Sequence, residues 1–290
     1  MKRKLMFRIA VVALLSAAGL RWTAAANAGS TIDNANRCAY GANIGWSDWF
    51  ADGTNGAVVS DYVCSGFIYA ANVGWINLGS GFPGNGIRYQ NASASDFGVN
   101  NDGRGNLRGY AWGANIGWII FEDNGGPTVN LQSGIFSGYV WSANCGWISL
   151  SNAVAFVQTD HILPGPMDAN GLPKPWELEH FGHVGIDPNA DPDHDGMSNL
   201  QEYLAGTDPN DPNDCLWITN FTRSATGQNF LSWTSVPTRY YCIQQSSALG
   251  DTTQPFTDTC IYWGLGWHST NFYDSGGPMF YRIRAFRPLP

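Results

Sequence analysis

The chain has 290 residues, of which 44% are hydrophobic, and its 23 acidic residues outnumber its 15 lysines and arginines. Such a chain can bury real cores, in about two domains joined by a connector. Its negative charge disfavours partners that are themselves negative, namely nucleic acid and anionic membrane surfaces.

Residues 1–28 have the pattern of a secretory signal peptide, with Lys2, Arg3 and Lys4 before an apolar run and a small-x-small ending at Ala26 to Ala28. The apolar run is about 12 residues long, short of the roughly 20 that span a membrane, so we expect cleavage rather than an uncleaved anchor. Cleavage removes five of the 15 basic residues and no acidic residue, which leaves a net charge of about -13. We therefore predict a secreted or cell-surface protein, with the periplasm as the alternative, and no membrane insertion after cleavage.

All six cysteines follow the signal peptide, and an even number in an exported chain is typical of disulfides. We expect two pairs that each close a loop of moderate length within one domain: Cys38 with Cys64, and Cys242 with Cys260. Cys145 replaces an aliphatic residue of the repeats described next, so we interpret it as a small buried hydrophobic residue. The pairing of Cys145 and Cys215 stays open.

Residues 29–160 contain one phrase four times: YGANIGWSDWF, YAANVGWINLG, WGANIGWIIFE and WSANCGWISLS. Its tryptophans, Trp46, Trp75, Trp118 and Trp147, are separated by 29, 43 and 29 residues, which indicates units duplicated as pairs. Asn and Gly tolerate positive φ and are flanked by aromatic or β-branched residues, so each copy predicts a strand, a tight turn and a second strand. The segment predicts a compact β domain, either a sandwich or a small barrel of hairpins.

The four repeat tryptophans have two interpretations. In the structural one, each indole packs into a shared core layer. In the functional one, they form an aromatic platform for sugar rings, which exposure of Trp46, Trp49, Trp112 or Trp141 together would favour. The repeated asparagines, Asn43, Asn72, Asn115 and Asn144, have the same ambiguity, and turn formation is the simpler explanation for them.

Residues 161–214 predict a connector that starts with a Pro/Gly-rich boundary and contains short helices at 176–181 and 198–205. Within it, three aspartates alternate along the chain, a glycine follows, and a twelve-residue frame places oxygens at positions 1, 3, 5, 9 and 12. The predicted ligands of a Ca2+ ion are Asp191, Asp193, Asp195, the Met197 carbonyl, Asn199 and Glu202. Position 8 is Ser198, where the full EF-hand pattern has a hydrophobic residue, so a lone or differently paired site is indicated.

The run from Asn189 to Asp214 resembles the thrombospondin type 3-like calcium repeats of bacterial exported proteins, in which D-x-D-x-D-G, a short helix with Glu, and G-T-D-P recur. This resemblance implies that the three aspartates and Glu202 bind calcium, and it adds Asp208 as a further ligand. The whole layout, with its signal peptide, A-N-x-G-W-I repeats, calcium stretch and terminal β module, is also similar to exported bacterial proteins that have no settled activity.

Residues 215–290 alternate polar and apolar side chains over short strands and resemble a fibronectin type III-like sandwich. The predicted Cys242–Cys260 disulfide departs from that pattern, and it would offset the thin core of so small a module. The predicted fold class is therefore mainly β: an N-terminal repeat-built domain, a short helical calcium-binding connector and a C-terminal β-sandwich.

The sequence has no nucleophile elbow, phosphate-binding loop or H-E-x-x-H motif, so we expect no catalytic residues. The prediction is a secreted calcium-binding structural or adhesive surface protein whose partners are cell-surface or extracellular glycans or proteins. One alternative is a carbohydrate-binding protein that uses exposed aromatic residues. The other is an extracellular hydrolase, for which Glu122 is a candidate acid whose partner the sequence does not fix.

Overall fold

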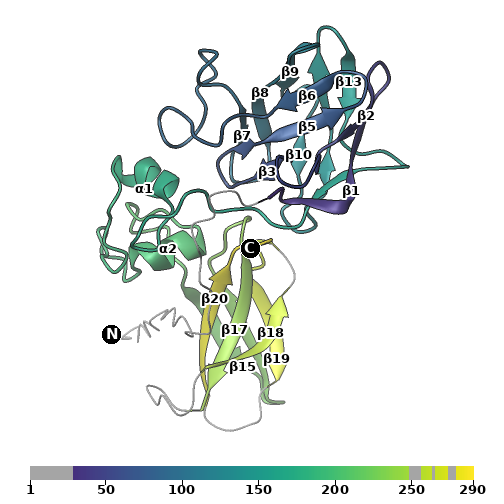
Figure 1. The fold of residues 1–290 in the computed structure, drawn as a ribbon. Helices are drawn as coiled ribbons and strands as arrows, with labels where there is room; N and C mark the ends of the chain where they lie inside the picture. Colours follow the sequence, from purple (N-terminus) through teal and green to yellow (C-terminus); the bar gives the residue numbers. More distant parts are fainter. Residues whose placement is uncertain (1–28, 248–255, 263–264, 274–278) are drawn as a thin grey trace. The chain divides into compact units, whose positions relative to one another are not determined.

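The computed structural model describes residues 29–290 except 248–255, 263–264 and 274–278, so the predicted signal peptide lies outside the described residues. As predicted, the fold is mainly β, with antiparallel sheets and, in the described residues, two short helices (Figure 1). These helices are α1 (Lys174–Phe181) and α2 (Asn199–Ala205). Within the described ranges, no helix has the length and apolar character needed to cross a membrane.

The chain divides into two compact units. The repeat unit ends at Ile186 and also includes Pro288–Pro290, and the C-terminal unit is Asp187–Arg287. The boundary thus lies inside the connector expected at 161–214, so that α1 belongs to the repeat unit and the predicted calcium loop to the C-terminal unit. The last residues return to the repeat unit, where Leu289 packs against its core and accepts a hydrogen bond from the Ile162 N–H (2.8 Å).

The repeat unit is built on a closed, barrel-like sheet in which β13 pairs with β1. Every neighbouring pair around the barrel is antiparallel, so the four A-N-x-G turns lie at one end of it. The barrel strands are β1 (Ile32–Gly41), β2 (Gly45–Asp48), β5 (Phe67–Ala70), β6 (Gly74–Asn77), β8 (Leu107–Gly113), β9 (Gly117–Phe121), β12 (Tyr139–Ser142) and β13 (Gly146–Ser149). The other strands of the unit are β3 (Val58–Val59), β4 (Cys64–Ser65), β7 (Val99–Asn101), β10 (Thr128–Val129), β11 (Phe136–Ser137) and β14 (Val157–Thr159).

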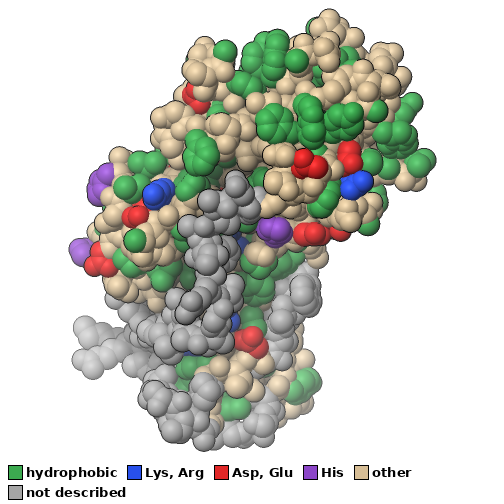
Figure 2. Space-filling view, in the orientation of Figure 1, with side chains coloured by type: hydrophobic (Ala, Val, Ile, Leu, Met, Phe, Trp, Pro, Cys, Tyr) green, Lys and Arg blue, Asp and Glu red, His purple; other side chains and the backbone are tan. Residues whose placement is uncertain are grey.

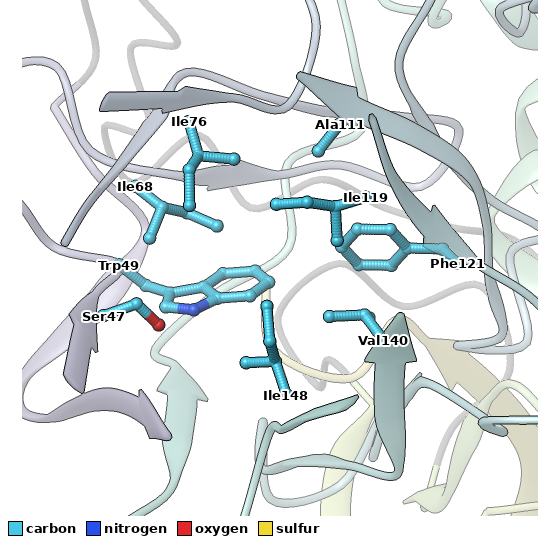
Figure 3. Close-up of a pocket in the computed structure, with 9 residues that line it drawn as sticks. All are labelled: Ser47, Trp49, Ile68, Ile76, Ala111, Ile119, Phe121, Val140 and Ile148. Carbon is cyan, nitrogen blue, oxygen red and sulfur yellow. The ribbon is translucent and has the colours of Figure 1, made fainter. Parts of the chain in front are cut away.

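The barrel interior is a packed core of small and aliphatic side chains around one tryptophan, Trp49 (Figure 3). Along each strand, alternate residues point inward, as the pleat of a β-strand requires. Eight strands leave an interior only wide enough for side chains to fill. The residues drawn around Trp49 are Ser47, Ile68, Ile76, Ala111, Ile119, Phe121, Val140 and Ile148.

Each A-N-x-G sequence forms a three-residue hairpin loop closed by a glycine with positive φ. In the first copy, β1 and β2 pair up to Gly41 and Gly45, and Gly45 has φ +75°. The Ile44 N–H donates to the Gly41 carbonyl (3.2 Å), which is the geometry of a type I turn followed by a left-handed residue. Glycine reaches this conformation without steric cost.

The repeated asparagines do more than form their own turns, because they connect the four turns in a ring. Each side-chain amide donates to the carbonyl of the residue before the turn glycine in the preceding copy, and the first copy closes the circle on the fourth. The bonds are Asn72 to Ile44 (3.0 Å), Asn115 to Val73 (3.1 Å), Asn144 to Ile116 (3.0 Å) and Asn43 to Cys145 (3.0 Å).

The C-terminal unit contains two three-stranded antiparallel sheets, β15-β16-β19 and β18-β17-β20. Their inward side chains join one core, as expected of a β-sandwich. Strands β17 and β16 supply Ile243 and Trp233 to that core. The strands are β15 (Ile218–Arg223), β16 (Gln228–Trp233), β17 (Tyr240–Ser246), β18 (Thr257–Tyr262), β19 (Ser269–Tyr273) and β20 (Phe280–Phe286).

The predicted disulfide between Cys38 and Cys64 is not formed in this structure, where both residues are free thiols. Burial raises the pKa of the Cys64 thiol to about 12. Cys145 is free and buried in the barrel core, in the place of an aliphatic residue. The predicted partner of Cys242, the Cys260 side chain, lies outside the described part of the chain.

Candidate metal centre and aromatic belt

The calcium frame predicted at 191–202 is a loop that turns into α2. Two left-handed positions on either side of Asp195 bend it: His194 has φ +64° and Gly196 has φ +97°. The start of the loop is tied to the start of the helix, because the Asn199 amide donates to the Asp187 carbonyl (2.8 Å). The Ser198 N–H, at the N-cap, donates to the Gln201 side chain (2.8 Å).

The three predicted aspartates converge, with one carboxylate oxygen of each lying within 4.8 Å of the others. Each uses one oxygen to hold the loop: Asp191 accepts from the Gly196 N–H (3.0 Å), Asp193 from the Asp195 N–H (3.2 Å), and Asp195 from the Met197 N–H (2.6 Å). The second oxygen of each aspartate is buried and has no hydrogen-bond partner. The loop's own hydrogen bonds therefore leave one oxygen per aspartate for a ligand.

Asn199 and Glu202, at positions 9 and 12, complete the cluster from the first turns of α2. They are 1% and 0% exposed. The Asn199 side-chain oxygen and both carboxylate oxygens of Glu202 are also buried without a hydrogen-bond partner. Unpaired buried carboxylates are costly, and either a proton or a bound cation relieves that cost. Oxygen ligands are those that Ca2+ takes, and the residues present therefore fit the ion.

The pKa values of the cluster reflect the cost of burying several carboxylates together. Burial, together with the charges of Asp193, Asp195 and Asp191, raises the pKa of Glu202 to about 8. Burial is also the main cause that raises the pKa values of Asp193 and Asp195. A bound divalent ion would reverse this preference, because it favours the ionised carboxylates.

Two further predicted ligands, Asp208 and the Met197 carbonyl, are not among the unpartnered buried side-chain oxygens. Asp208 is exposed and accepts a hydrogen bond from the Asn210 N–H (3.1 Å), so its oxygens are not grouped with the buried ones. The Met197 side chain is buried in the core of the C-terminal unit, and its carbonyl remains a predicted ligand. Sequence reasoning missed Thr207, whose buried hydroxyl has no partner and whose N–H donates to the Glu202 carbonyl (3.2 Å).

The loop and α2 are part of the C-terminal unit rather than a separate connector. Met197 and Ala205 belong to the same core cluster as Trp233 and Ile283. Arg239 also donates to the Leu204 carbonyl at the end of α2 (2.9 Å), where a cation is favoured by the free carbonyls. Order in the loop is thus coupled to the packing of the sandwich.

The repeat tryptophans are on the outside of the barrel, so their interpretation as a core layer is wrong. Trp46, Trp75, Trp118 and Trp147 are 47%, 46%, 41% and 50% exposed. Each faces an aromatic residue across its hairpin: Tyr40, Tyr69, Trp112 and Trp141, respectively. We call these eight residues, with the exposed Phe67, Tyr110 and Tyr139, the aromatic belt.

The cross-strand aromatic pair has nearly the same geometry in the first two copies. Ring centroids are 4.9 Å apart for Tyr40 and Trp46, and 5.0 Å for Tyr69 and Trp75, with interplanar angles of 58° and 59°. Hydrophobic side chains gather in patches on the visible face of the repeat unit (Figure 2). An exposed apolar surface of this kind is typical of an interaction site.

Two acidic residues of the repeat unit form ion pairs with arginines. Asp123, next to the hydrolase candidate Glu122, pairs with Arg108. Asp48 pairs with Arg37 (3.3 Å) and accepts the Phe50 N–H. Neither ion pair involves Glu122, and the hydrolase alternative stays a prediction.

No protein-family profile matches the chain, and nothing among the curated proteins or the solved structures matches it either.

Proposed function

We propose that the protein is a secreted calcium-binding structural or adhesive protein, in which residues 191–202 hold one Ca2+. The observation that carries this proposal is the set of buried side-chain oxygens without hydrogen-bond partners at positions 1, 3, 5, 9 and 12 of the frame. They come from Asp191, Asp193, Asp195 and Asn199, one each, and from Glu202, two. A bidentate glutamate at position 12 is the usual arrangement of such loops.

When bound, the ion supplies the positive charge that this cluster lacks. The chain's own residues convert that binding into stability. The aspartates hold the loop through their hydrogen-bonded oxygens, which leaves the unpartnered ones for the ion, and Met197 and Ala205 fix loop and helix in the sandwich core. A ligand that binds only the folded state stabilises it, by ~2.7 kcal/mol at 100 times its Kd. We propose that calcium outside the cell maintains the C-terminal unit in this way.

The test is calorimetric titration of the mature chain with Ca2+, combined with thermal unfolding in calcium and in chelator. We expect one ion per chain and a melting temperature that rises with calcium. The double variant Asp193→Ala/Asp195→Ala should lose both effects and become sensitive to protease between Pro188 and Asn213. Asp211→Ala removes an exposed acid outside the frame and serves as the control. No heat of binding at millimolar calcium would refute the proposal.

A second candidate function is carbohydrate binding by the aromatic belt, and the joint exposure of its rings favours it. Aromatic ring faces stack on the apolar faces of sugar rings, and the acidic chain favours neutral glycans over polyanionic ones. The four copies would form a multivalent set around the barrel, which raises avidity for a repeating polysaccharide.

We would measure this with a glycan array, followed by titration with the oligosaccharides that bind. Trp75→Ala and Trp147→Ala should each weaken binding, and the double variant should weaken it further. Trp217→Ala is the matched control, because Trp217 is 58% exposed and belongs to the C-terminal unit. If all three single variants bind as the wild type does, the belt has another role.

A further inference from the structure

A second loop and helix in the chain repeats the calcium frame 25 residues earlier. In α1, Glu177 occupies the place of Glu202 and is likewise 0% exposed. Counting back from it as position 12, Gly171 falls at position 6, where the calcium loop has Gly196. The earlier frame, 166–177, lies entirely in the repeat unit.

The backbones of the two loops agree at the turn glycine of position 6, whereas at position 4 His194 is left-handed and Ala169 is not. Gly171 has φ +91°, close to the +97° of Gly196. The side chain at position 5 accepts the N–H of position 7 in both: Asn170 from Leu172 (2.9 Å), and Asp195 from Met197.

The helices that follow also correspond. Position 7 is buried in each loop, and position 8 is an extended N-cap residue, with ψ 130° at Pro173 and 159° at Ser198. The N–H of the position 12 glutamate donates to the carbonyl of position 8, at 3.1 Å in α1 and 2.9 Å in α2. Each helix ends at a left-handed glycine, Gly182 or Gly206.

The two loops differ at the ligand positions of the frame, and the earlier loop has residues there that do not bind a cation. Pro166 stands where the calcium loop has Asp191, and Lys174 stands where it has Asn199, so two oxygen ligands are lost and a positive charge is introduced. Asn170 replaces the aspartate of position 5. These residues do not fit a calcium ion, because too few oxygens remain.

Hydrogen-bond donors take the place of the cation beside Glu177. One carboxylate oxygen accepts from the Asn170 side-chain amide (2.6 Å), the Ile186 N–H (2.8 Å) and the Gly185 N–H (3.1 Å). The same Asn170 amide donates to the Ile186 carbonyl (2.8 Å). These three donors satisfy one carboxylate oxygen without an ion, while the other oxygen is buried without a hydrogen-bond partner.

We propose that residues 166–181 are a second copy of the calcium loop and helix, in which the Asn170 amide and two backbone N–H groups replace the ion. The region 161–214 then has one half that folds without calcium and one half that depends on it. This inference uses the calcium loop of the proposed function as its reference, but the substitutions below test it separately.

The experiment restores the ligands with the triple variant Pro166→Asp/Asn170→Asp/Lys174→Asn in the full mature chain, titrated with CaCl2 in a calorimeter. We expect two ions per chain instead of one. In the background of Asp193→Ala/Asp195→Ala, which should bind none, the same three substitutions should give one. If that combined variant binds no ion, or if Asp193→Ala/Asp195→Ala alone still binds one, the proposal is wrong.

A single substitution covers the case in which the triple variant fails to fold. Asn170→Asp removes the amide donor and places two carboxylates, those of residues 170 and 177, together. In chelator, protease should therefore cut residues 166–186 of this variant faster than those of the wild type. Millimolar CaCl2 should restore the protection. Asn170→Ala loses the same donor without gaining an oxygen, and it should be cut equally fast with and without CaCl2. Equal behaviour of the two variants in CaCl2 would overturn the proposal.

Discussion

Glu202→Gln should change the stability of the C-terminal unit in opposite directions with and without calcium. The substitution keeps the shape of a side chain that is 0% exposed, and it replaces a carboxylate oxygen by an amide that can donate to the unpartnered oxygens nearby. In chelator, the variant removes a buried acid from a cluster of acids. In calcium, it removes the bidentate ligand.

The magnitude follows from the pKa of Glu202, which is about 8 in the ion-free fold against an ordinary 4.5. At pH 7 the folded protein keeps this group protonated, while the unfolded chain ionises it. Each pH unit between 4.5 and 7 is worth ~1.4 kcal/mol, so the cost to the ion-free fold is roughly 3 kcal/mol. A glutamine does not bear that cost, so the variant should be more stable than the wild type in chelator.

In calcium the wild type should be more stable than the variant, the reverse of the order expected in chelator. At 100 times its Kd the ion adds ~2.7 kcal/mol to the wild type, which raises the melting temperature of a unit of about 100 residues by about 10–20 °C. The variant should lose most of this shift. Differential scanning calorimetry in chelator and in millimolar calcium measures both signs, with Glu177→Gln as the matched control, since that buried glutamate should show no calcium dependence. A loss of stability of equal size in both conditions would refute the reasoning.

Three further predictions concern pH, the turns and the thiols. Because the pKa of Glu202 is raised to about 8, the ion-free fold binds a proton that the unfolded chain lacks between pH 4.5 and about 8. The melting temperature in chelator should therefore fall as pH rises through that window. In calcium, the melting temperature should depend less on pH. Asn115→Ala breaks one bond of the asparagine ring and should lower the free energy of unfolding of the repeat unit by ~1 kcal/mol in denaturant titrations, whereas the same change at Asn210, outside the repeats, should not. The Cys64 thiol, with its pKa of about 12, should stay unmodified by iodoacetamide at pH 8 until the protein unfolds, and rapid modification of the native protein would contradict its burial.

The hairpins and the calcium loop could be predicted from sequence because both depend on local conformation. The A-N-x-G phrase specifies a left-handed glycine between two strands, and the structure has it at Gly45. The calcium frame likewise specifies a bend at Gly196 and a glutamate in the first turns of a helix. Local rules of this kind involve few residues and no distant partner.

The outward position of the tryptophans could not be read from local rules, since it depends on the width of the closed sheet. Trp75 and Ile76 are neighbours on one strand, so the pleat sends one of them in and the other out. An eight-stranded barrel that already encloses Trp49 has room for the isoleucine. The ring of asparagine bonds is equally non-local, because each bond joins residues that are at least 28 positions apart.

The two buried glutamates, Glu177 and Glu202, both bury a carboxylate, but their surroundings differ. Each follows a glycine-containing loop, and each is held away from water on a short helix, where a carboxylate needs compensation. Around Glu177, nitrogen donors from Asn170 and from residues 185 and 186 bind one of its two carboxylate oxygens, and these donors are present whatever the solvent contains. Around Glu202, the neighbours are other acids, so compensation must come from outside the chain. Stability that depends on an external cation can be gained where calcium is abundant and lost where it is scarce, and the position of Met197 in the sandwich core makes the C-terminal unit the part of the molecule that would respond.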